Sequence, residues 1–347
     1  MDNTNPSTSA VASRQQSERI LKYITNHWLS CCVYVSARLN IADILSDGPK
    51  TIDELAEITA THRPSLYRLL RTLASDGIFE ESAPGTFSIT QAATALRGNV
   101  QGSLKAFVLA ELGDFYNPWG QLLYSVQTGK IAFDHYHGMN LWEYYKTHPE
   151  EGLNFMKAMT DLTQVMNQAV AEKYDFSTFK TLIDIGGGNG ELMFSVLKAT
   201  PGLNGIVFDE LYVVEQTAAR IKAIPDIAGR CSVAAGNFFE QVPPGADAYM
   251  MKYILHDWHD EDALKILRAC SNAMKTGSKI LAIDAVIPQG NLPHGGKLMD
   301  VNMLVVTGGY ERTKEEFSSL YEQAGLRFLR VVDIGLTELS IVEGEKI

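Results

Sequence analysis

The chain has 347 residues, enough for two domains with a sizeable core, and 46% of them are hydrophobic while 20% are charged. Its formal net charge of −11 argues against nucleic acid or an anionic membrane as the main partner, because both bind clustered basic charge. No run reaches the roughly 18 apolar residues that a membrane span needs, so the expected location is the cytoplasm.

The first sixteen residues are rich in Ser, Thr, Asn and Gln and lack the apolar core of a signal peptide, so they predict a disordered tail. From residue 17 to about 47, apolar residues recur every three or four positions, which predicts a helix. The four cysteines show no metal-binding CxxC spacing and are expected to be reduced thiols.

Residues 50–97 have the pattern of a winged helix. Thr51 precedes a helical stretch with Glu54 three residues on, which is the signature of a capping box. A second helix is expected after Pro64, ending at Gly77, and residues 78–81 and 86–89 read as a β-hairpin. Residues 100–175 are then predicted to form several helices, with one apolar stripe at Trp119, Leu122, Leu123 and Val126 and another after Pro149.

Beyond Thr181, short apolar strands alternate with helices, which favours a mostly parallel sheet covered on both faces. The predicted strands are 182–185, 205–209, 231–234, 248–251, 280–283 and a final strand at 340–344. The fold class is therefore α/β, with a Rossmann-like domain behind a mostly helical winged-helix domain. The expected divisions are a tail at 1–16, a winged-helix domain at 17–100, a helical linker region at 101–178, and the Rossmann-like domain at 179–347.

A glycine-rich run, residues 184–190, follows the first of these strands, where open α/β sheets bind ligands. Gly186 and Gly188 would let the backbone approach a ligand closely. Glu191 stands where a dinucleotide fingerprint needs its third glycine, and an anionic side chain at a helix N-terminus suits a cationic sulfonium better than a pyrophosphate.

Asp209 ends the second strand, about 20 residues after the glycines, where a carboxylate accepts hydrogen bonds from ribose hydroxyls. Its alternative role is that of a helix cap. Asn237 and Phe238 follow the third strand and are placed to contact adenine by its edge and face, and Lys252 ends the fourth strand near the same crevice.

His256 lies just past that fourth strand, on the side where the cofactor is expected. Histidine titrates near neutrality, so it can remove the proton of an acceptor hydroxyl as methyl transfer proceeds. A carboxylate on its far nitrogen would orient it, and Asp284 and Glu311 are both candidates for that position. For Glu311, compensation of a helix dipole is an equal alternative.

These motifs together resemble the plant and bacterial small-molecule O-methyltransferases, the group that includes caffeic acid and hydroxyindole O-methyltransferases. The likeness runs from about residue 17 to the last strand and includes residues 252–261 and 308–313. The resemblance implies S-adenosylmethionine as methyl donor, S-adenosylhomocysteine as product, no metal, and a homodimer formed through the N-terminal domain. It implies that His256 is the general base and Glu311 its partner, with Asp284 where relatives often carry Glu.

By the same resemblance, the acceptor pocket is expected to be lined by Phe155, Met159, Asp257 and Met303. The chain departs from the family at Glu210, where relatives read Leu, and at Asn237, where they carry Asp; both departures bear on cofactor affinity. The predicted acceptor is a phenolic or enolic hydroxyl of a small aromatic secondary metabolite. The open alternatives are N-methylation, a non-transfer reaction such as hydroxylation or pericyclic rearrangement, and a winged-helix DNA-binding regulator, which Arg63, Arg68 and Arg71 would serve.

Overall fold

The computed structural model describes residues 6–335 and 339–347. The chain forms two compact units. The N-terminal unit comprises the chain up to Tyr116 together with residues 149–162, and the sheet unit comprises residues 117–148 and 163–347. This division differs from the predicted one, because the short helices after Tyr116 pack against a helix of the sheet unit.

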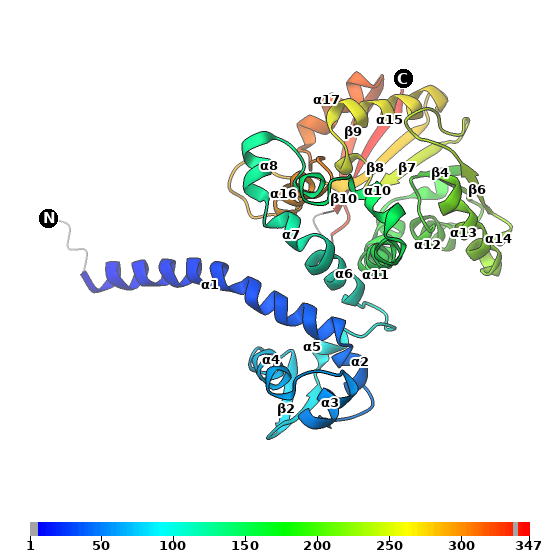
Figure 1. Cartoon of the computed structure of the whole chain (residues 1–347). Helices are drawn as coiled ribbons and strands as arrows, with labels where there is room; N and C mark the ends of the chain where they lie inside the picture. The colour runs from blue at the N-terminus through cyan, green and yellow to red at the C-terminus, as the bar shows by residue number, and fades with distance from the viewer. Residues whose placement is uncertain (1–5, 336–338) are drawn as a thin grey trace. The chain divides into compact units, whose positions relative to one another are not determined.

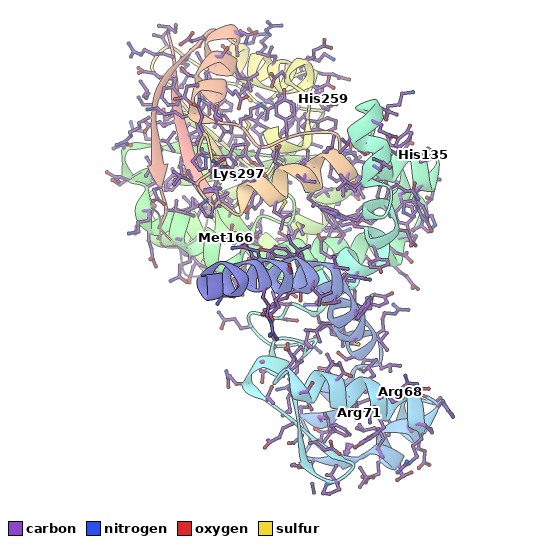
Figure 2. All side chains as sticks on the ribbon, turned by 90° about the vertical axis from the view of Figure 1, so that its left-hand side faces the viewer. Arg68, Arg71, His135, Met166, His259 and Lys297 are labelled. Carbon is purple, nitrogen blue, oxygen red and sulfur yellow. The ribbon has the colours of Figure 1, made fainter. Side chains whose placement is uncertain are left out.

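The N-terminal unit contains the predicted winged helix. Its elements are α1 (Pro6–Arg38), α2 (Ile41–Leu45), β1 (Lys50–Thr51), α3 (Ile52–Ile58), α4 (Arg63–Ser75), β2 (Phe79–Ala83), β3 (Thr86–Ile89), α5 (Gln91–Thr94), α6 (Lys105–Leu109) and the π-helix η1 (Ala110–Asp114). Thr51 and Glu54 form the expected reciprocal capping box at the start of α3. The hairpin of β2 and β3 gains β1 as a third strand. Figure 2 shows Arg68 and Arg71 on α4.

The start of the chain corrects one prediction. Helix α1 begins at Pro6, so the expectation of a disordered tail is wrong for residues 6–16. Proline is well suited to a first helical turn, and Ala, Gln, Glu and Arg in the next three turns are good helix formers. Residues 1–5 lie outside the described residues.

The middle of the chain is broken into short helices. They are α7 (Tyr116–Trp119), α8 (Leu122–Thr128), α9 (Ala132–His137) and α10 (Leu141–Thr147), followed by the long α11 (Pro149–Lys173). These helices match the several helices predicted for residues 100–175. The stripe from Trp119 to Val126 is divided between α7 and α8, and Leu123 and Val126 are about two-thirds exposed. The helix expected after Pro149 is confirmed as α11.

The sheet unit is a seven-stranded sheet in the order β6-β5-β4-β7-β8-β10-β9. Five strands are parallel: β4 (Thr181–Ile185), β5 (Asn204–Asp209), β6 (Cys231–Ala235), β7 (Ala248–Lys252) and β8 (Lys279–Ala285). The final strand β10 (Leu339–Lys346) runs antiparallel between β8 and β9 (Leu326–Asp333), and β9 was not predicted. Figure 1 shows helices flanking this sheet.

Alternate residues of the strands enter two separate cores, as expected for a sheet covered on both faces. Leu182 and Met250 pack with α12 (Glu191–Ala199), while Ile183 and Tyr249 pack with α15 (Asp260–Ala273) and α17 (Lys314–Gln323). The remaining helices are the 3₁₀ turn η2 (Phe176–Thr178), α13 (Leu211–Lys222), α14 (Pro225–Ala228), the 3₁₀ turn η3 (Leu255–Asp257) and α16 (Gly296–Val306). Even the longest helices of the described residues lack the apolar run that a membrane crossing requires.

Candidate active site

The glycine-rich loop joins β4 to α12 and is held from one side by α13. Gly186 and Gly188 adopt φ of +65° and +54°, a region that L side chains rarely enter. A Cβ on Gly186 would lie 2.4 Å from the side chain of Ile254. Thr217 donates to the Gly188 carbonyl at 2.8 Å, and Arg220 donates to the Asn189 carbonyl at 2.7 Å. The loop is therefore fixed before any ligand arrives.

Asp209 ends β5 and its carboxylate faces this loop. It accepts hydrogen bonds from the backbone N–H of Gly188 at 2.8 Å and of Glu210 at 2.7 Å. Helix α13 starts two residues later with Glu210 as its N-cap residue, and no side chain caps it, so Asp209 does not act as a helix cap. Burial raises the pKa of the Asp209 carboxyl, and its remaining lone pairs are available to ribose hydroxyls.

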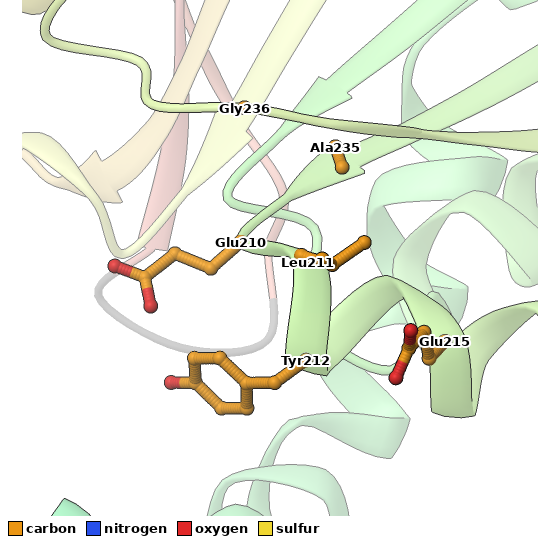
Figure 3. Close-up of a pocket in the computed structure, with 6 residues that line it drawn as sticks. All are labelled: Glu210, Leu211, Tyr212, Glu215, Ala235 and Gly236. Atoms are coloured by element: carbon orange, nitrogen blue, oxygen red, sulfur yellow. The ribbon is translucent and has the colours of Figure 1, made fainter.

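Next to Asp209 the surface is hollowed, with a volume of about 540 Å³. Figure 3 shows the residues that line this hollow, namely Glu210, Leu211, Tyr212, Glu215, Ala235 and Gly236. A Cβ on Gly236 would lie 2.7 Å from the Phe208 ring, so this position also requires glycine. The Asp209 carboxylate bonds the glycine loop, and the hollow begins at the next residue, Glu210.

Of the two residues expected at adenine, Phe238 lies 3.6 Å from the Cβ position of Gly186, which brings its ring to the glycine loop. Asn237 is exposed, and its side-chain carbonyl accepts from the backbone N–H of Phe239 at 3.0 Å. A carbonyl oxygen has a second lone pair, so this local turn leaves Asn237 able to accept from an adenine amino group.

Lys252 ends β7, and its ammonium donates to the side-chain carbonyl of Asn167. Burial lowers the pKa of Lys252 to about 8, although the carboxylates of Asp184 and Glu191 act against that shift. Asp184 is itself buried, which raises its pKa to about 7. Asp184 begins the predicted glycine-rich run, whereas Asn167 was not predicted, because nothing in the local pattern distinguishes it from a core residue.

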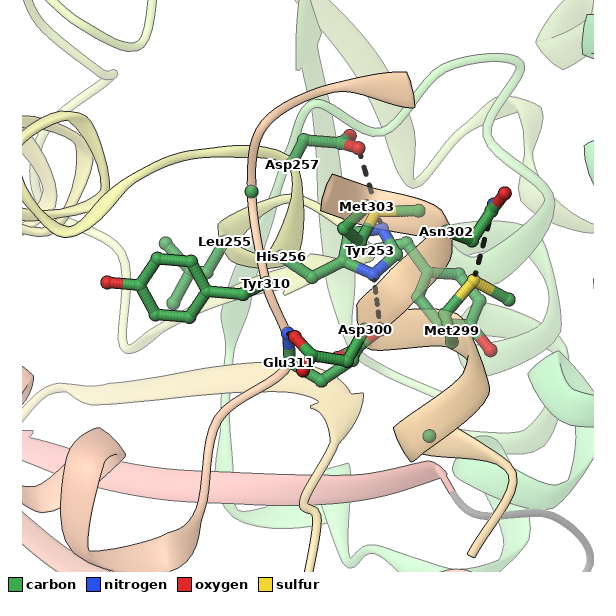
Figure 4. Close-up of polar contacts among 12 residues, drawn as sticks. Tyr253, Leu255, His256, Asp257, Met299, Asp300, Asn302, Met303, Tyr310 and Glu311 are labelled. Carbon is green, nitrogen blue, oxygen red and sulfur yellow. Dashed lines mark hydrogen bonds and ion pairs between the residues drawn. The ribbon is translucent and has the colours of Figure 1, made fainter. Parts of the chain in front are cut away.

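His256 lies in the turn η3 that follows β7, and it is buried. Its Nδ1 is 2.8 Å from Oε1 of Glu311, and its Nε2 is 3.8 Å from a carboxylate oxygen of Asp257 (Figure 4). Burial disfavours the imidazolium, but the carboxylates of Asp257 and Glu311 outweigh it and raise the pKa of His256 to about 9. The structure thus brings together the predicted base and one of its two predicted carboxylate partners.

Glu311 does not open a helix, because α17 starts only after the Thr313 cap, so helix-dipole compensation does not account for it. Its backbone N–H donates to Asp300 of α16 at 2.9 Å. The neighbouring Arg312 is 1% exposed and donates to the carbonyls of Leu255 and Trp258 at 2.8 and 2.9 Å. These bonds tie the segment that carries Glu311 to the turn that carries His256.

Asp284, the other candidate partner, lies at the end of β8 and is fully buried. Neither of its carboxyl oxygens has a hydrogen-bond partner among the described residues. Burial raises the pKa of the Asp284 carboxyl, while the charge of His256 acts against that shift. Glu311, not Asp284, makes the orienting bond to His256.

Two backbone features shape the surroundings of His256. Tyr253 has a φ of +55°, which is uncommon for a non-glycine residue and often marks functional sites, and its ring stacks on His256 at 5.0 Å. Gly309 packs so tightly that a Cβ there would lie 1.9 Å from the His256 carbonyl oxygen. The glycine pair at 308–309 thus lets two chain segments meet at the base.

The four residues expected around the acceptor fall in different units. Asp257 and Met303 belong to the sheet unit with His256, and Met303 is buried on α16. Phe155 and Met159 belong to the N-terminal unit, where the Phe155 ring packs edge-on against Phe115 at 6.2 Å. The joint role of these four residues at one pocket stays a prediction.

Comparison with known proteins agrees with this geometry. An O-methyltransferase domain model matches residues 119–327, and an O-methyltransferase dimerisation domain model matches residues 21–98. The chain belongs to this O-methyltransferase family. It is 39% identical to the phenazine O-methyltransferase PhzM of Lysobacter antibioticus, over 95% of this chain and 96% of that protein. It is 35% identical to the mitomycin biosynthesis 6-O-methyltransferase of Streptomyces lavendulae, over 98% and 97%.

Solved structures give the same result. The crystal structure of LaPhzM superposes with a TM-score of 0.91 at 39% identity, covering 96% of this chain and 99% of that one. The O-methyltransferase NcsB1 from neocarzinostatin biosynthesis, in complex with S-adenosylmethionine and 2-hydroxy-5-methyl naphthoic acid, gives 0.82 at 31% identity, covering 92% and 96%. The enzyme is thus an O-methyltransferase that uses S-adenosylmethionine. Within the described residues, no three or more His, Cys, Asp or Glu side chains are grouped to hold a metal ion.

Proposed function

We propose that the enzyme methylates a phenolic or enolic hydroxyl of a small aromatic secondary metabolite, with His256 as the general base. The observation that supports this most strongly is the buried His256–Glu311 pair beside the cofactor residues at the carboxyl edge of the sheet. Relatives of the chain act, by their names, on phenazine, mitomycin and hydroxybenzoate or naphthoate compounds, which supports an aromatic acceptor.

S-adenosylmethionine, when bound, supplies a methyl group on a sulfonium that an acceptor oxygen can attack. The residues proposed to hold it are Gly186, Gly188, Asp209, Asn237, Phe238 and Lys252. The fixed loop, the Asp209 carboxylate and the hollow beside it support this assignment, since they offer backbone approach, ribose acceptors and room for an adenine.

Glu311 accepts the hydrogen bond of His256 Nδ1–H, which leaves the lone pair on Nε2 to receive the proton of the acceptor hydroxyl. The imidazolium that forms is then stabilised by Glu311 and Asp257. A positioned base of this kind contributes roughly 10²–10⁴-fold to the rate. Asp284 is proposed to act on His256 through its charge, which raises the pKa of the imidazole, and Phe155, Met159, Asp257 and Met303 are proposed to surround the acceptor.

The dimerisation match supports a homodimer, and we assign its interface to the N-terminal domain. Several large apolar side chains of α1 are exposed in the single chain, among them Ile20, Ile24 and Trp28. We do not assign nucleic acid or a membrane as a partner. On α4, Arg63 pairs with Asp53, and Arg71 lies 5.7 Å from the centre of the Tyr67 ring, so these cations contact protein groups. A cytoplasmic location is proposed, because no run of the sequence reaches the roughly 18 apolar residues that a membrane span needs.

Calorimetric titration with S-adenosylmethionine and S-adenosylhomocysteine, followed by a phenol panel that reads S-adenosylhomocysteine release, tests this function. We expect binding of both ligands and release on some phenols, with the methyl on oxygen by NMR of the product. A methyl found on nitrogen would instead indicate N-methylation, the reaction named for a relative, the 8-amino-8-demethylriboflavin N,N-dimethyltransferase of Streptomyces davaonensis. Binding without release on a broad panel would contradict methyl transfer to phenols.

A further inference from the structure

The side chain of Asn302 on α16 is held in one orientation by Trp119. The indole N–H of Trp119 donates to the side-chain carbonyl of Asn302 at 2.9 Å. An indole nitrogen can only donate, so it fixes which end of the amide faces Trp119. The NH₂ end of Asn302 must therefore point away from the indole.

That NH₂ group has little to bind within the protein. Its partner among the described residues is the thioether sulfur of Met299, 3.8 Å away, and a thioether is a weak acceptor. Asn302 and Trp119 are both half-buried, so the amide is not simply a solvated surface group. When a bound ligand excludes water from a half-buried amide, the amide N–H costs free energy unless the ligand supplies a hydrogen-bond acceptor.

Helix α16 connects Asn302 to the catalytic residues. Asp300, two residues earlier, accepts from the backbone of Glu311, which bonds His256. Met299 and Met303 are four residues apart and share a face of the helix, with Asn302 adjoining it. Figure 4 shows Asn302 and Met299 together on α16 within the group of residues around His256.

We propose that the NH₂ group of Asn302 determines acceptor specificity by donating to a carbonyl-type oxygen, most simply a carboxylate, on the aromatic acceptor. This inference rests on the proposed function, because it concerns the acceptor of the same reaction. Trp119 is a positioning residue in it, since it stops the amide from presenting its carbonyl instead. Acceptors that carry such an oxygen near the methylated hydroxyl are then favoured over acceptors without it.

The test compares 3-hydroxy-2-naphthoic acid with 2-naphthol, which differ only in the carboxylate. Calorimetry on the full-length protein saturated with S-adenosylhomocysteine gives the dissociation constant of each. We expect the acid to bind about tenfold more tightly, as for a hydrogen bond to a charged group. Asn302→Leu should abolish this preference, and Asn302→Asp should reverse it, because the new carboxylate repels the ligand.

Two further variants make the result specific. Trp119→Phe keeps an aromatic ring but loses the indole N–H. The preference for the acid over the naphthol should therefore weaken, while the affinity for S-adenosylhomocysteine stays the same. Leu298→Ala, at a 69% exposed position one turn before Asn302 on the same helix, should keep the full preference. The affinity of every variant for S-adenosylhomocysteine reports whether it is folded.

Equal binding of the two ligands by the unaltered protein, or a preference that survives Asn302→Leu, would overturn the assignment of Asn302. Failure of the proposed function is a separate result, because it is read from S-adenosylhomocysteine release on the phenol panel. A protein that releases product from phenols but binds acid and naphthol equally is an O-methyltransferase without this specificity device.

Discussion

The cofactor edge and the catalytic turn of the sheet unit are built in different ways. At the cofactor edge, adjacent strands deliver a glycine loop and an aspartate whose carboxylate accepts a hydrogen bond from the backbone of that loop. At the catalytic turn, the histidine follows one strand while its partner Glu311 is 55 residues further on and is held there by Arg312 and Asp300. The first region depends on local chain geometry, and the second on the packing of distant segments.

This difference implies that each region can be damaged alone. Variants at the catalytic turn should lower turnover and leave cofactor affinity intact, and variants at the cofactor edge should do the reverse. The four predictions that follow run from the largest expected effect to the smallest.

Glu311→Gln should have the largest effect of the four. It removes the charge that stabilises the imidazolium and can present an N–H instead of an acceptor to Nδ1, which favours the wrong tautomer. We expect kcat to fall by about 10²-fold or more, in line with orienting carboxylates of other catalytic histidines. The dissociation constant of S-adenosylmethionine should stay unchanged by calorimetry, and unchanged kcat would remove Glu311 from the mechanism.

Gly309→Ala tests the close approach of two segments at the base. Its Cβ would meet the backbone of His256 at 1.9 Å, and backbone cannot move aside as a flexible side chain can. We expect a loss of turnover of about tenfold or more, by the cost of misplacing catalytic groups. Gly229→Ala is the matched control, since nothing lies within 4 Å of its Cβ and its φ is ordinary. Equal kcat in both variants would contradict this account of the turn.

Asp209→Ala should weaken S-adenosylmethionine and S-adenosylhomocysteine binding by about tenfold, the value of one charge-assisted hydrogen bond. Asp226→Ala, which removes an exposed carboxylate of α14 outside the hollow, should leave both affinities nearly unchanged. The pH profile of turnover at saturating cofactor should not move in either variant. Wild-type affinity in Asp209→Ala would mean that the ribose lies elsewhere.

Asp257→Asn should shift the pH dependence with the smallest loss of rate. The base must be neutral, so kcat/KM for a weakly acidic phenol should rise with pH up to the pKa of His256, about 9. The Asp257 carboxylate helps to raise that pKa, and its removal should therefore move the rising limb to lower pH. A limb that stays in place, or moves to higher pH, would exclude Asp257 as a source of the shift.

Much of the cofactor edge was predictable because its signals are local. The glycine spacing and the strand that ends in Asp209 each need only a few consecutive residues, and both appear as expected. The capping box at Thr51 in the N-terminal unit is a local signal of the same kind and also appears as expected. The catalytic pair was predictable only in part. Spacing placed His256 at the strand end but left both Asp284 and Glu311 as candidates for its carboxylate partner. The choice between them depends on how β8 and the segment before α17 pack.

The remaining features depend on contacts that periodicity does not encode. The Trp119–Asn302 bond joins residues that are far apart in the sequence. The positive φ of Tyr253 and the burial of Arg312 follow no repeat in the sequence. The bounds of the middle helices were not predictable, since an apolar stripe such as Trp119 to Val126 looks the same whether it lies on one helix or on two. The helix at residues 6–16 shows that a polar composition alone does not establish disorder.

The most direct test of the central claim compares His256→Ala with the unaltered enzyme on two acceptors, a weakly acidic phenol and a nitrophenol already ionised at the assay pH. The account predicts that turnover of the phenol falls by about 10²–10⁴-fold, the contribution of a positioned base, while turnover of the nitrophenol falls far less because it needs no base. Equal losses on both acceptors, or unchanged turnover of the phenol, would contradict the role of His256 as the base.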